Sequence, residues 1–128
     1  ISMSFSTTSD VSTIRESIQH AYFRGVKMVA AAGNSNAATK NYPAAYDQVI
    51  AVGSTTSSNG RSSFSNYGTW VDISAPGSSI LSTYPTNTTT SLSGTSMSTP
   101  MVAGVIGLVL SRNNFTMKKS GLSSEVLL

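Results

Sequence analysis

Two short and almost uninterrupted apolar runs constrain the fold of this 128-residue chain more than any other feature. They are "VKMVAAAG" at residues 26–33 and "QVIAVGS" at residues 48–54. Apolar runs without polar alternation are typical of strands covered on both faces, as in a parallel sheet. The alternating segment "ISMSFS" at residues 1–6 predicts another strand at the start of the chain.

A helix is predicted between the strand at residues 1–6 and the strand at residues 26–33. Ser9 and Asp10 offer an N-cap, and Gly25 suits the position just after the last helical residue. Strand, helix and strand joined by short turns form a right-handed βαβ unit, which indicates a single α/β domain with a parallel sheet. The apolar face of this helix consists of Val11, Ile14, Ile18, Ala21 and Tyr22.

The second half of the chain is rich in turns, with short strands expected near residues 61–66, 70–77 and 80–85. A second helix is predicted over residues 96–111, followed by a surface loop at residues 112–121. Its apolar run, residues 101–110, is half of the roughly twenty residues that a bilayer span needs, so we expect a core helix. Because the chain starts within a strand, without Met, and ends near a helix cap at Ser123 or Ser124, we expect both ends to be cut.

The composition argues against several classes of protein. The chain has no cysteine, which excludes disulfides and thiol chemistry. The formal net charge is +3, but the basic residues are scattered rather than gathered into a stripe, so we expect no nucleic-acid partner. We expect no membrane partner either. Two sequons, at Asn87 and Asn114, matter only in a eukaryotic secretory route.

Candidate chemistry gathers where the predicted strands end, because ligands of parallel sheets bind at the carboxyl ends of the strands. Residues 4–6 end the first strand, Asn34 follows "VAAAG", and Ser96 opens the second helix. A serine at a helix N-terminus has its backbone N–H free, and the Asn34 amide could supply a second donor to an oxyanion. Taken singly, Ser96 is an ordinary N-cap and Asn34 an ordinary loop residue.

Six segments together favour the catalytic interpretation. "GTSMSTPMVAG" at residues 94–104 resembles the serine motif of the subtilisin-like serine proteases, the subtilases or peptidase S8 family. The other five resemble motifs of that family in the same order: "ISMSFS", "VAAAGN", "NYPAAYDQVIAVGS", "RSSFSNYG" and "VDISAPG". The resemblance covers residues 1–110. It implies that residues 1–128 form the carboxyl-terminal part of a three-layer, doubly wound subtilisin-like catalytic domain, incomplete on its N-terminal side.

The resemblance also implies roles for individual residues. Ser96 matches the nucleophile of an endopeptidase that forms an acyl-enzyme, and Asn34 matches the side chain that binds the oxyanion. The Tyr42–Pro43 peptide matches a cis bond of the family. The other matched residues contact an extended polypeptide substrate and are Ser4, Phe5, Ser6, Ala31, Ala32, Gly33, Asn41, Thr95 and Met97.

The rest of the catalytic triad has no match in this chain. In the family the aspartate and the histidine precede the substrate-binding strand, and this chain begins at that strand. Its one histidine, His20, lies in mid-helix and is interpreted as a surface residue. We therefore expect the isolated chain to be inactive, with the upstream part of the same domain as its partner. The alternative is a non-catalytic peptide-binding fragment or pseudoprotease. The family implies secretion, although no signal peptide is visible.

A weak cation site is a further expectation from the resemblance. Asp72 matches a carboxylate at a weak Na⁺ or Ca²⁺ site, which carbonyl oxygens of Ala44, Tyr46 and Val49 would complete. Trp70 occupies the place of a second acidic residue, so an ordinary turn is the alternative. No cofactor is expected to be required.

Overall fold

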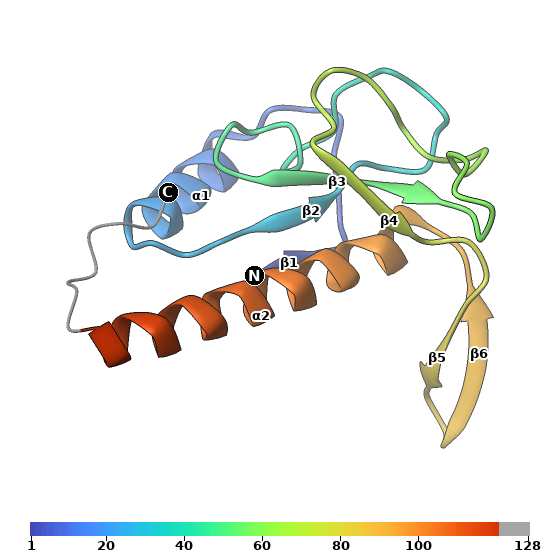
Figure 1. The fold of residues 1–128 in the computed structure, drawn as a ribbon. Coiled ribbons are helices and arrows are strands. Elements are labelled where there is room, and N and C mark those ends of the chain that lie inside the picture. Colours follow the sequence, from blue (N-terminus) through green and yellow to red (C-terminus); the bar gives the residue numbers. More distant parts are fainter. Residues whose placement is uncertain (121–128) are drawn as a thin grey trace.

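The computed structural model places a four-stranded sheet between two helices and adds a projecting hairpin (Figure 1). It describes the backbone of residues 1–120 and the side chains of residues 1–112. The helices and strands in chain order are β1 (Ser2–Met3), α1 (Ser12–Phe23), β2 (Val29–Ala31), β3 (Ile50–Thr55), β4 (Ile73–Pro76), β5 (Ile80–Tyr84), β6 (Thr88–Leu92) and α2 (Thr95–Ser120).

The sheet is parallel throughout, with the strand order β1-β2-β3-β4. Its register pairs Met3 with Ala30, Ala30 with Ala51, and Val52 with Ile73. The predicted α/β class and the βαβ unit of β1, α1 and β2 are thus confirmed.

A separate apolar core lies on each face of the sheet. On the α1 side, Met28 and Ala30 pack with Ile18 of the helix, and on the α2 side Val29 packs with Val102. Successive residues of a strand point to opposite faces, so an unbroken apolar run supplies both cores at once. The result is three layers: α1, the sheet and α2.

Helix α1 ends where the sequence predicts but begins differently. Gly25 has a φ of +77° and donates its N–H to the Tyr22 carbonyl at 2.9 Å, as expected just after a helix. The predicted cap at Ser9-Asp10 is wrong, since the N-cap is Val11 and no side chain caps the helix. The Asp10 carboxylate instead accepts a hydrogen bond from the Tyr46 hydroxyl at 2.9 Å and lies 3.4 Å from Arg15.

The turn-rich middle of the chain departs from prediction at two places. Residues 61–66 form a turn and not a strand. The turn is attached to the end of β3 by an isolated antiparallel bridge between Arg61 and Thr55 and by Ser65 Oγ, which accepts the N–H of Ser54. The strand expected near residues 80–85 is β5, and β6, which was not predicted, pairs with it antiparallel. Asn87, the first sequon, lies in the turn of this hairpin with a φ of +57°.

Helix α2 extends to Ser120, so the prediction of a loop at residues 112–121 is wrong up to that residue. No glycine or proline interrupts the chain between Gly107 and Gly121, and nothing local ends the helix earlier. Gly121, the cap at Ser123 or Ser124 and the Asn114 side chain lie outside the described residues. Neither described helix combines the length and apolar character needed to cross a bilayer.

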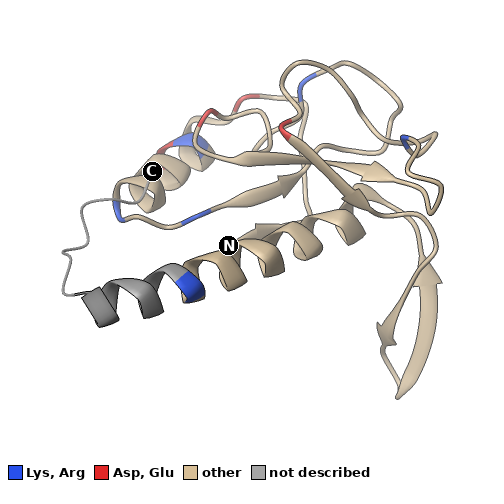
Figure 2. Ribbon diagram, in the orientation of Figure 1, with Lys and Arg blue, Asp and Glu red and all other residues tan. Residues whose placement is uncertain are grey.

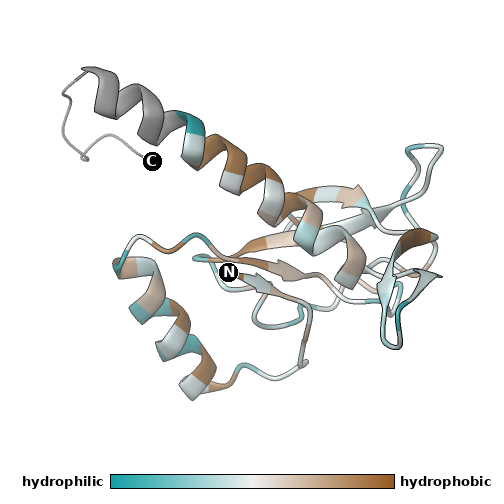
Figure 3. Ribbon diagram, turned by 90° about the horizontal axis from the view of Figure 1, so that it is seen from below, coloured by the Kyte–Doolittle hydropathy of each residue, from teal (hydrophilic) through white to brown (hydrophobic). Residues whose placement is uncertain are grey.

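Charge and hydropathy are unevenly distributed over the molecule. Charged residues lie on α1 and the loops, whereas the hairpin and the first turns of α2 carry none before Arg112 (Figure 2). The turns of α2 at residues 101–110 are strongly apolar (Figure 3). Val105, Leu108 and Val109 are nevertheless 60%, 73% and 52% exposed. Only one side of this apolar helix is therefore covered by the described residues.

Candidate active site

Three segments that are distant in sequence meet at the carboxyl edge of the sheet. They are the end of β1, the end of β2 and the start of α2, and they meet because α2 packs across β1, β2 and β3. Gly33 donates its N–H to Thr95 Oγ1 at 3.1 Å, and Ser4 Oγ donates to the Ser96 carbonyl at 3.1 Å. We call Gly33, Asn34, Thr95 and Ser96 the Asn34 corner. The sequence-predicted nucleophile and oxyanion residue are thus brought together.

Ser96 is the second residue of α2 and is half-buried. Its hydroxyl makes no hydrogen bond with any residue that the structure describes. Proline at position 100 has no N–H to give to the Ser96 carbonyl four residues earlier, and Ser4 Oγ takes that place. The backbone N–H of Ser96 lies in the first turn, where no helical acceptor exists. Ser96 therefore combines an unpaired hydroxyl with an unpaired donor.

The carboxamide of Asn34 is held by its oxygen. Asn34 Oδ1 accepts hydrogen bonds from Thr95 N at 2.8 Å and from Thr95 Oγ1 at 2.9 Å. Because the oxygen is turned toward Thr95, the NH₂ group is the end left for another partner. A Cβ placed on Gly94 would lie 3.4 Å from that Nδ2 atom, so the NH₂ group borders the start of α2. Thr95 itself is completely buried, which fixes its side chain.

Gly33 is required at its position for two reasons. Its φ of +106° is strained for any residue with a side chain. A Cβ there would also collide with Asn41 Nδ2 and Asn66 Nδ2. The chain can therefore turn out of β2 and present Asn34 only with glycine before it.

The residues predicted to shape a substrate pocket surround the end of β2. Asn41 is buried and donates Nδ2 to the Ala32 carbonyl at 3.2 Å, directly beneath the turn. Ala31 and Ala32 are at most 4% exposed, so their methyl groups face the protein interior. The Tyr42–Pro43 peptide that follows Asn41 is cis, as the resemblance implied.

The segment of residues 4–6 runs exposed along the edge of the sheet. Phe5 is 58% exposed, and among the described residues neither Phe5 nor Ser6 makes a main-chain hydrogen bond. An antiparallel bridge fixes the segment at its far end, where Thr7 and Tyr42 exchange hydrogen bonds of 2.9 and 2.8 Å. An extended edge with unpaired N–H and C=O groups is the geometry that accepts another strand.

A hollow of about 410 Å³ opens beside Ser96. The hairpin strand β5 supplies one wall and the first turns of α2 the other. Met97, predicted to contact substrate, is one of its lining residues. The whole lining is Ile80, Leu81, Ser82, Ser96, Met97, Pro100 and Met101. Sequence reasoning missed the contribution of β5, because only the fold brings the hairpin next to the helix.

No base faces Ser96 within the described residues. His20 is exposed on α1, and α1 covers the sheet face opposite to α2. Asp10 pairs with Tyr46 and Arg15, also on the α1 side. The interpretation of His20 as a surface residue is confirmed by its exposure. A nucleophilic Ser96 would need a proton acceptor from elsewhere.

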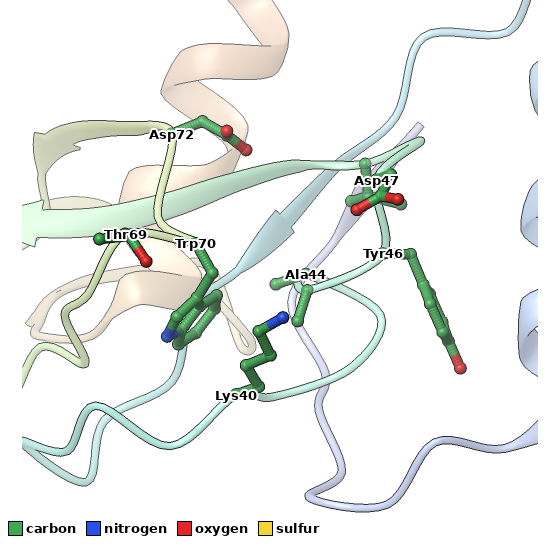
Figure 4. A pocket seen from close by; sticks show the side chains of 9 residues that line it. Lys40, Ala44, Tyr46, Asp47, Thr69, Trp70 and Asp72 are labelled. Carbon is green, nitrogen blue, oxygen red and sulfur yellow. The ribbon is translucent and has the colours of Figure 1, made fainter.

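The predicted cation ligands line a second hollow, of about 290 Å³ (Figure 4). Asp72 Oδ2 already accepts the Ala51 N–H at 2.8 Å, and the Tyr46 carbonyl already accepts the Val49 N–H at 2.9 Å. The Lys40 side chain lines the same hollow and brings a positive charge, and Asp47, which sequence reasoning did not place there, brings a second carboxylate. No group of three or more His, Asp or Glu side chains that could hold a metal occurs in the described part of the chain. The donors present fit a strongly bound divalent ion poorly.

Tyr46, which also lines this hollow, has a perturbed acidity. Burial raises the pKa of its hydroxyl, and the hydrogen bond to the Asp10 carboxylate and the charge of that carboxylate raise the pKa further. Its hydroxyl also donates toward the Val11 carbonyl at 3.2 Å. This contact attaches the start of α1 to the loop before β3, far from Ser96.

Comparison with known proteins decides the family. The sequence model described as the "Subtilase family" matches residues 1–126. The chain belongs to the subtilase family. Its fold is that of a partial subtilisin-like α/β domain: a solved subtilase, a cold adapted subtilisin-like serine proteinase, aligns with it at a TM-score of 0.83 and 46% identity, covering 88% of this chain and 41% of that one.

Two subtilases illustrate how much of a relative the chain represents. It is 52% identical to thermitase of Thermoactinomyces vulgaris over 112 residues, 88% of this chain and 40% of thermitase. It is 47% identical to subtilisin DY of Bacillus licheniformis over 116 residues, 88% of this chain and 42% of that relative. The chain thus spans about two fifths of the length of the subtilases it matches.

Proposed function

We propose that the complete protein containing this chain is a serine endopeptidase in which Ser96 forms the acyl-enzyme. The observation that carries the proposal is the orientation of Asn34. Thr95 holds its carboxamide oxygen with two hydrogen bonds, of 2.8 and 2.9 Å, and leaves the NH₂ group free at the N-terminus of α2. A plain loop asparagine would not need its oxygen held in this way beside an unpaired serine hydroxyl.

The chemical step follows from these donors. Ser96 Oγ attacks the carbonyl carbon of a peptide, and the carbonyl oxygen becomes an oxyanion as its double bond opens. The Ser96 N–H and Asn34 Nδ2 donate hydrogen bonds to that oxyanion, and the dipole of α2 favours the negative charge there. The hydroxyl proton passes to a base, which returns it to the leaving amine as the acyl-enzyme forms.

We infer that the base is a histidine, oriented by an aspartate, from another part of the same domain, which the family resemblance implies lies upstream of residues 1–128. The chain spans about two fifths of its relatives, which leaves room for such a part. The exposed apolar side of α2 supports the same inference, because Val105 and Leu108 are 60% and 73% exposed and would be covered by it.

The substrate is proposed to be an extended polypeptide that pairs with residues 4–6, since Phe5 and Ser6 leave their main-chain groups unpaired. Asn41, Ala31, Ala32 and Gly33 would border the residue before the scissile bond. We expect secretion of the complete protein, and neither nucleic acid nor membrane as a partner. A weak Na⁺ or Ca²⁺ site at Asp72 with carbonyls of Ala44, Tyr46 and Val49 stays a proposal, and the chemistry does not require it.

A non-catalytic peptide-binding role is the second candidate. It is favoured by the free edge at residues 4–6 combined with the lack of a base near Ser96 in the described residues. The two candidates agree on peptide binding and differ only in whether a bond is broken.

Turnover of a chromogenic tetrapeptide by the complete protein separates these candidates. We expect the wild type to be active and Ser96→Ala to lose about 10⁶-fold in kcat, which is the loss known for the nucleophile of subtilisin, another subtilase. His20→Ala, as the control, should keep its activity. The isolated 128-residue chain should show no turnover. A complete protein that binds peptide but hydrolyses none would establish the binding role, and equal losses in His20→Ala and Ser96→Ala would overturn the residue assignment.

A further inference from the structure

The loop after β2 carries Asn34 and has little regular structure of its own. It contains two residues with positive φ, Gly33 at +106° and Asn36 at +50°. Thr95 holds the Asn34 carboxamide and the Gly33 N–H but makes no contact with the backbone that follows Asn34. A side chain on a loop is placed only as accurately as the backbone on both of its sides. Some other group must therefore hold the backbone beyond Asn34.

Residues 64–67 hold this backbone. Asn36 donates its N–H to the Phe64 carbonyl at 2.8 Å and Tyr67 donates its N–H to the Ala37 carbonyl at 3.1 Å, and Asn66 adds the side-chain hydrogen bonds. Its Oδ1 atom accepts the N–H of Ser35 at 2.9 Å and the N–H of Ala37 at 3.2 Å. Its Nδ2 atom donates to the Ala32 carbonyl at 2.9 Å, and its backbone N–H donates to the Gly33 carbonyl at 2.9 Å. Asn66 thus holds the main chain on both sides of Asn34 without a hydrogen bond to Asn34 itself.

The chemistry of a carboxamide suits this position. Asn66 is only 2% exposed, so its polar atoms have no water to replace a lost partner. One oxygen with two lone pairs serves two backbone N–H groups, and the NH₂ group serves a carbonyl on the other side. A Cβ on Gly33 would come within 2.6 Å of Asn66 Nδ2, so the amide packs directly against the turn.

The turn that carries Asn66 is itself well anchored. Ser65 Oγ accepts the N–H of Ser54 in β3 at 2.9 Å and donates to the Asn66 carbonyl at 3.0 Å. The Arg61 guanidinium donates to the Ser65 carbonyl at 2.6 Å and to Asn36 Oδ1 at 2.9 Å. The position of Asn66 is therefore set by β3, an inner strand of the sheet. Through its hydrogen bonds, Asn66 in turn fixes the position of the loop.

We propose that Asn66 is a positioning residue for the oxyanion-binding amide of Asn34, an inference that rests on the proposed protease function. Its side chain acts through Ser35 N, Ala37 N and Ala32 O, and through them it fixes where Asn34 Nδ2 points. Asn66 touches neither Ser96 nor the edge at residues 4–6, so its role lies in the chemical step and not in substrate binding.

The test measures kcat and KM of the complete protein with Asn66→Ala, alone and combined with Asn34→Leu. A misplacement of about 1 Å costs on the order of 100-fold in rate, so we expect kcat to fall about 10- to 100-fold with KM within about threefold. In the Asn34→Leu background the same Asn66→Ala change should lower kcat less than about threefold. Asn66 acts through Asn34, so the two losses in kcat should not be additive. Asn66→Ser also removes the shared acceptor of Ser35 and Ala37 and should lose kcat to a similar extent.

Ser62→Ala is the matched control. Ser62 is completely buried in the same turn, but its hydroxyl bonds only to Ser54 Oγ at 2.8 Å and Ser78 Oγ at 2.7 Å. We expect it to lower the melting temperature and to leave kcat within about twofold, since the hydroxyl that is removed bonds to no residue of the Asn34 loop. A kcat loss in Ser62→Ala as large as in Asn66→Ala would overturn the proposal.

The outcomes separate this inference from the function on which it rests. A wild type without turnover overturns both. An active wild type whose Asn66→Ala variant keeps its kcat, or loses equally with and without Asn34, overturns the positioning role alone. If Asn66→Ala does not fold, the Asn66→Ser variant carries the same comparison, because it too removes the oxygen that accepts the Ser35 and Ala37 N–H groups. Unchanged kcat in it, together with unchanged amide exchange at Ser35 and Ala37, counts against the role.

Discussion

The Asn34 corner lies at the start of α2, and the turns around Leu108 and Val109 lie further along the same helix. Different forces hold these two regions. At the corner, Thr95 is completely buried and its hydroxyl and N–H both bond to Asn34. No buried side-chain nitrogen or oxygen lacks a partner in the described part of the chain. Further along, Leu108 and Val109 are 73% and 52% exposed. The corner depends on directional hydrogen bonds supplied by this chain, whereas Leu108 and Val109 are left largely uncovered by the described residues.

The geometry of the site and the stability of the helix that carries it are therefore specified separately. The hydrogen bonds that fix the corner join Gly33 and Asn34 to Thr95, all of which belong to this chain. Hydrophobic burial is proportional to the apolar area covered, and an uncovered helix face gains little of it. Substitutions that disturb one region or the other therefore test whether the effects stay separate.

Among the substitutions that separate the two regions, Asn34→Leu in the complete protein is expected to have the largest effect. The lost NH₂ group bonds only to an oxyanion, which exists near the transition state, so kcat should fall about 100- to 1,000-fold while KM changes little. That range is the one known for the oxyanion-hole asparagine of subtilisin, a member of the same family. Steady-state kinetics on a peptide substrate provides the measurement. A loss confined to KM would show that Asn34 binds the ground state instead.

A smaller effect, on stability, is expected from Leu108→Lys. In the isolated chain the side chain is 73% exposed, so the charge should reduce self-association and increase the monomer fraction seen by sedimentation. In the complete protein, where we propose that this face is covered, the same charge should lower the free energy of unfolding by about 3 kcal/mol.

Val102→Ala is the matched substitution on the covered side of α2. Val102 is 7% exposed, so its truncation should cost the complete protein about 2 kcal/mol through lost apolar burial. Neither variant should alter KM. If Leu108→Lys left the complete protein as stable as the wild type, the outer face of α2 would be solvent-exposed there too. The proposal that apolar contacts cover this face would then be wrong.

The smallest effect concerns pH and lies at the opposite side of the sheet. Burial and the Asp10 carboxylate raise the pKa of Tyr46 above its usual value of 10.0. A group whose folded pKa is raised stabilises the fold fully below its unfolded pKa and loses that contribution as pH rises through the folded pKa. The stability of the complete protein should therefore decline above pH 10 partly through Tyr46, and Tyr46→Phe should flatten that decline.

Denaturant unfolding of the two proteins between about pH 8 and 11, on either side of the usual tyrosine pKa, provides the measurement. At neutral pH, Tyr46→Phe should also cost about 1 kcal/mol for the lost hydrogen bond to Asp10. Tyr84→Phe serves as control, because Tyr84 is 51% exposed on the hairpin. If the free energy of unfolding fell equally steeply with rising pH in Tyr46→Phe and in the wild type, the loss of stability at alkaline pH would come from groups other than Tyr46.

The parts of this structure that could be predicted are those with a local signal. The apolar runs at residues 26–33 and 48–54 predict strands covered on both faces, because alternate side chains supply both cores. Gly25 predicts the end of α1, because its backbone conformation is a local property. Ser96 and Asn34 could be placed together because parallel strands bring their carboxyl ends to one edge.

The parts that could not be predicted depend on distant partners. Asp10 is a good cap by residue type, but Tyr46, 36 residues away, takes its carboxylate. Strand β6 is rich in threonine and shows no apolar alternation, so only its pairing with β5 reveals it. Asn66 stands in the segment "RSSFSNYG", yet its bonds to the loop around Asn34 join residues that lie 29 to 34 positions apart in the sequence.

The Asn34 corner is made of a glycine, an asparagine, a threonine and a serine, and none of them titrates between acid and alkali. Asn66 and Asn41, which support it, are neutral as well. Ionic strength screens charges but hardly affects hydrogen bonds between uncharged buried groups. This half of the site should thus be a constant background in any profile of rate against pH or salt. Each inflection that the complete protein displays would then report the ionisation of groups outside the corner, above all its base, and could be assigned without correction for the oxyanion donors.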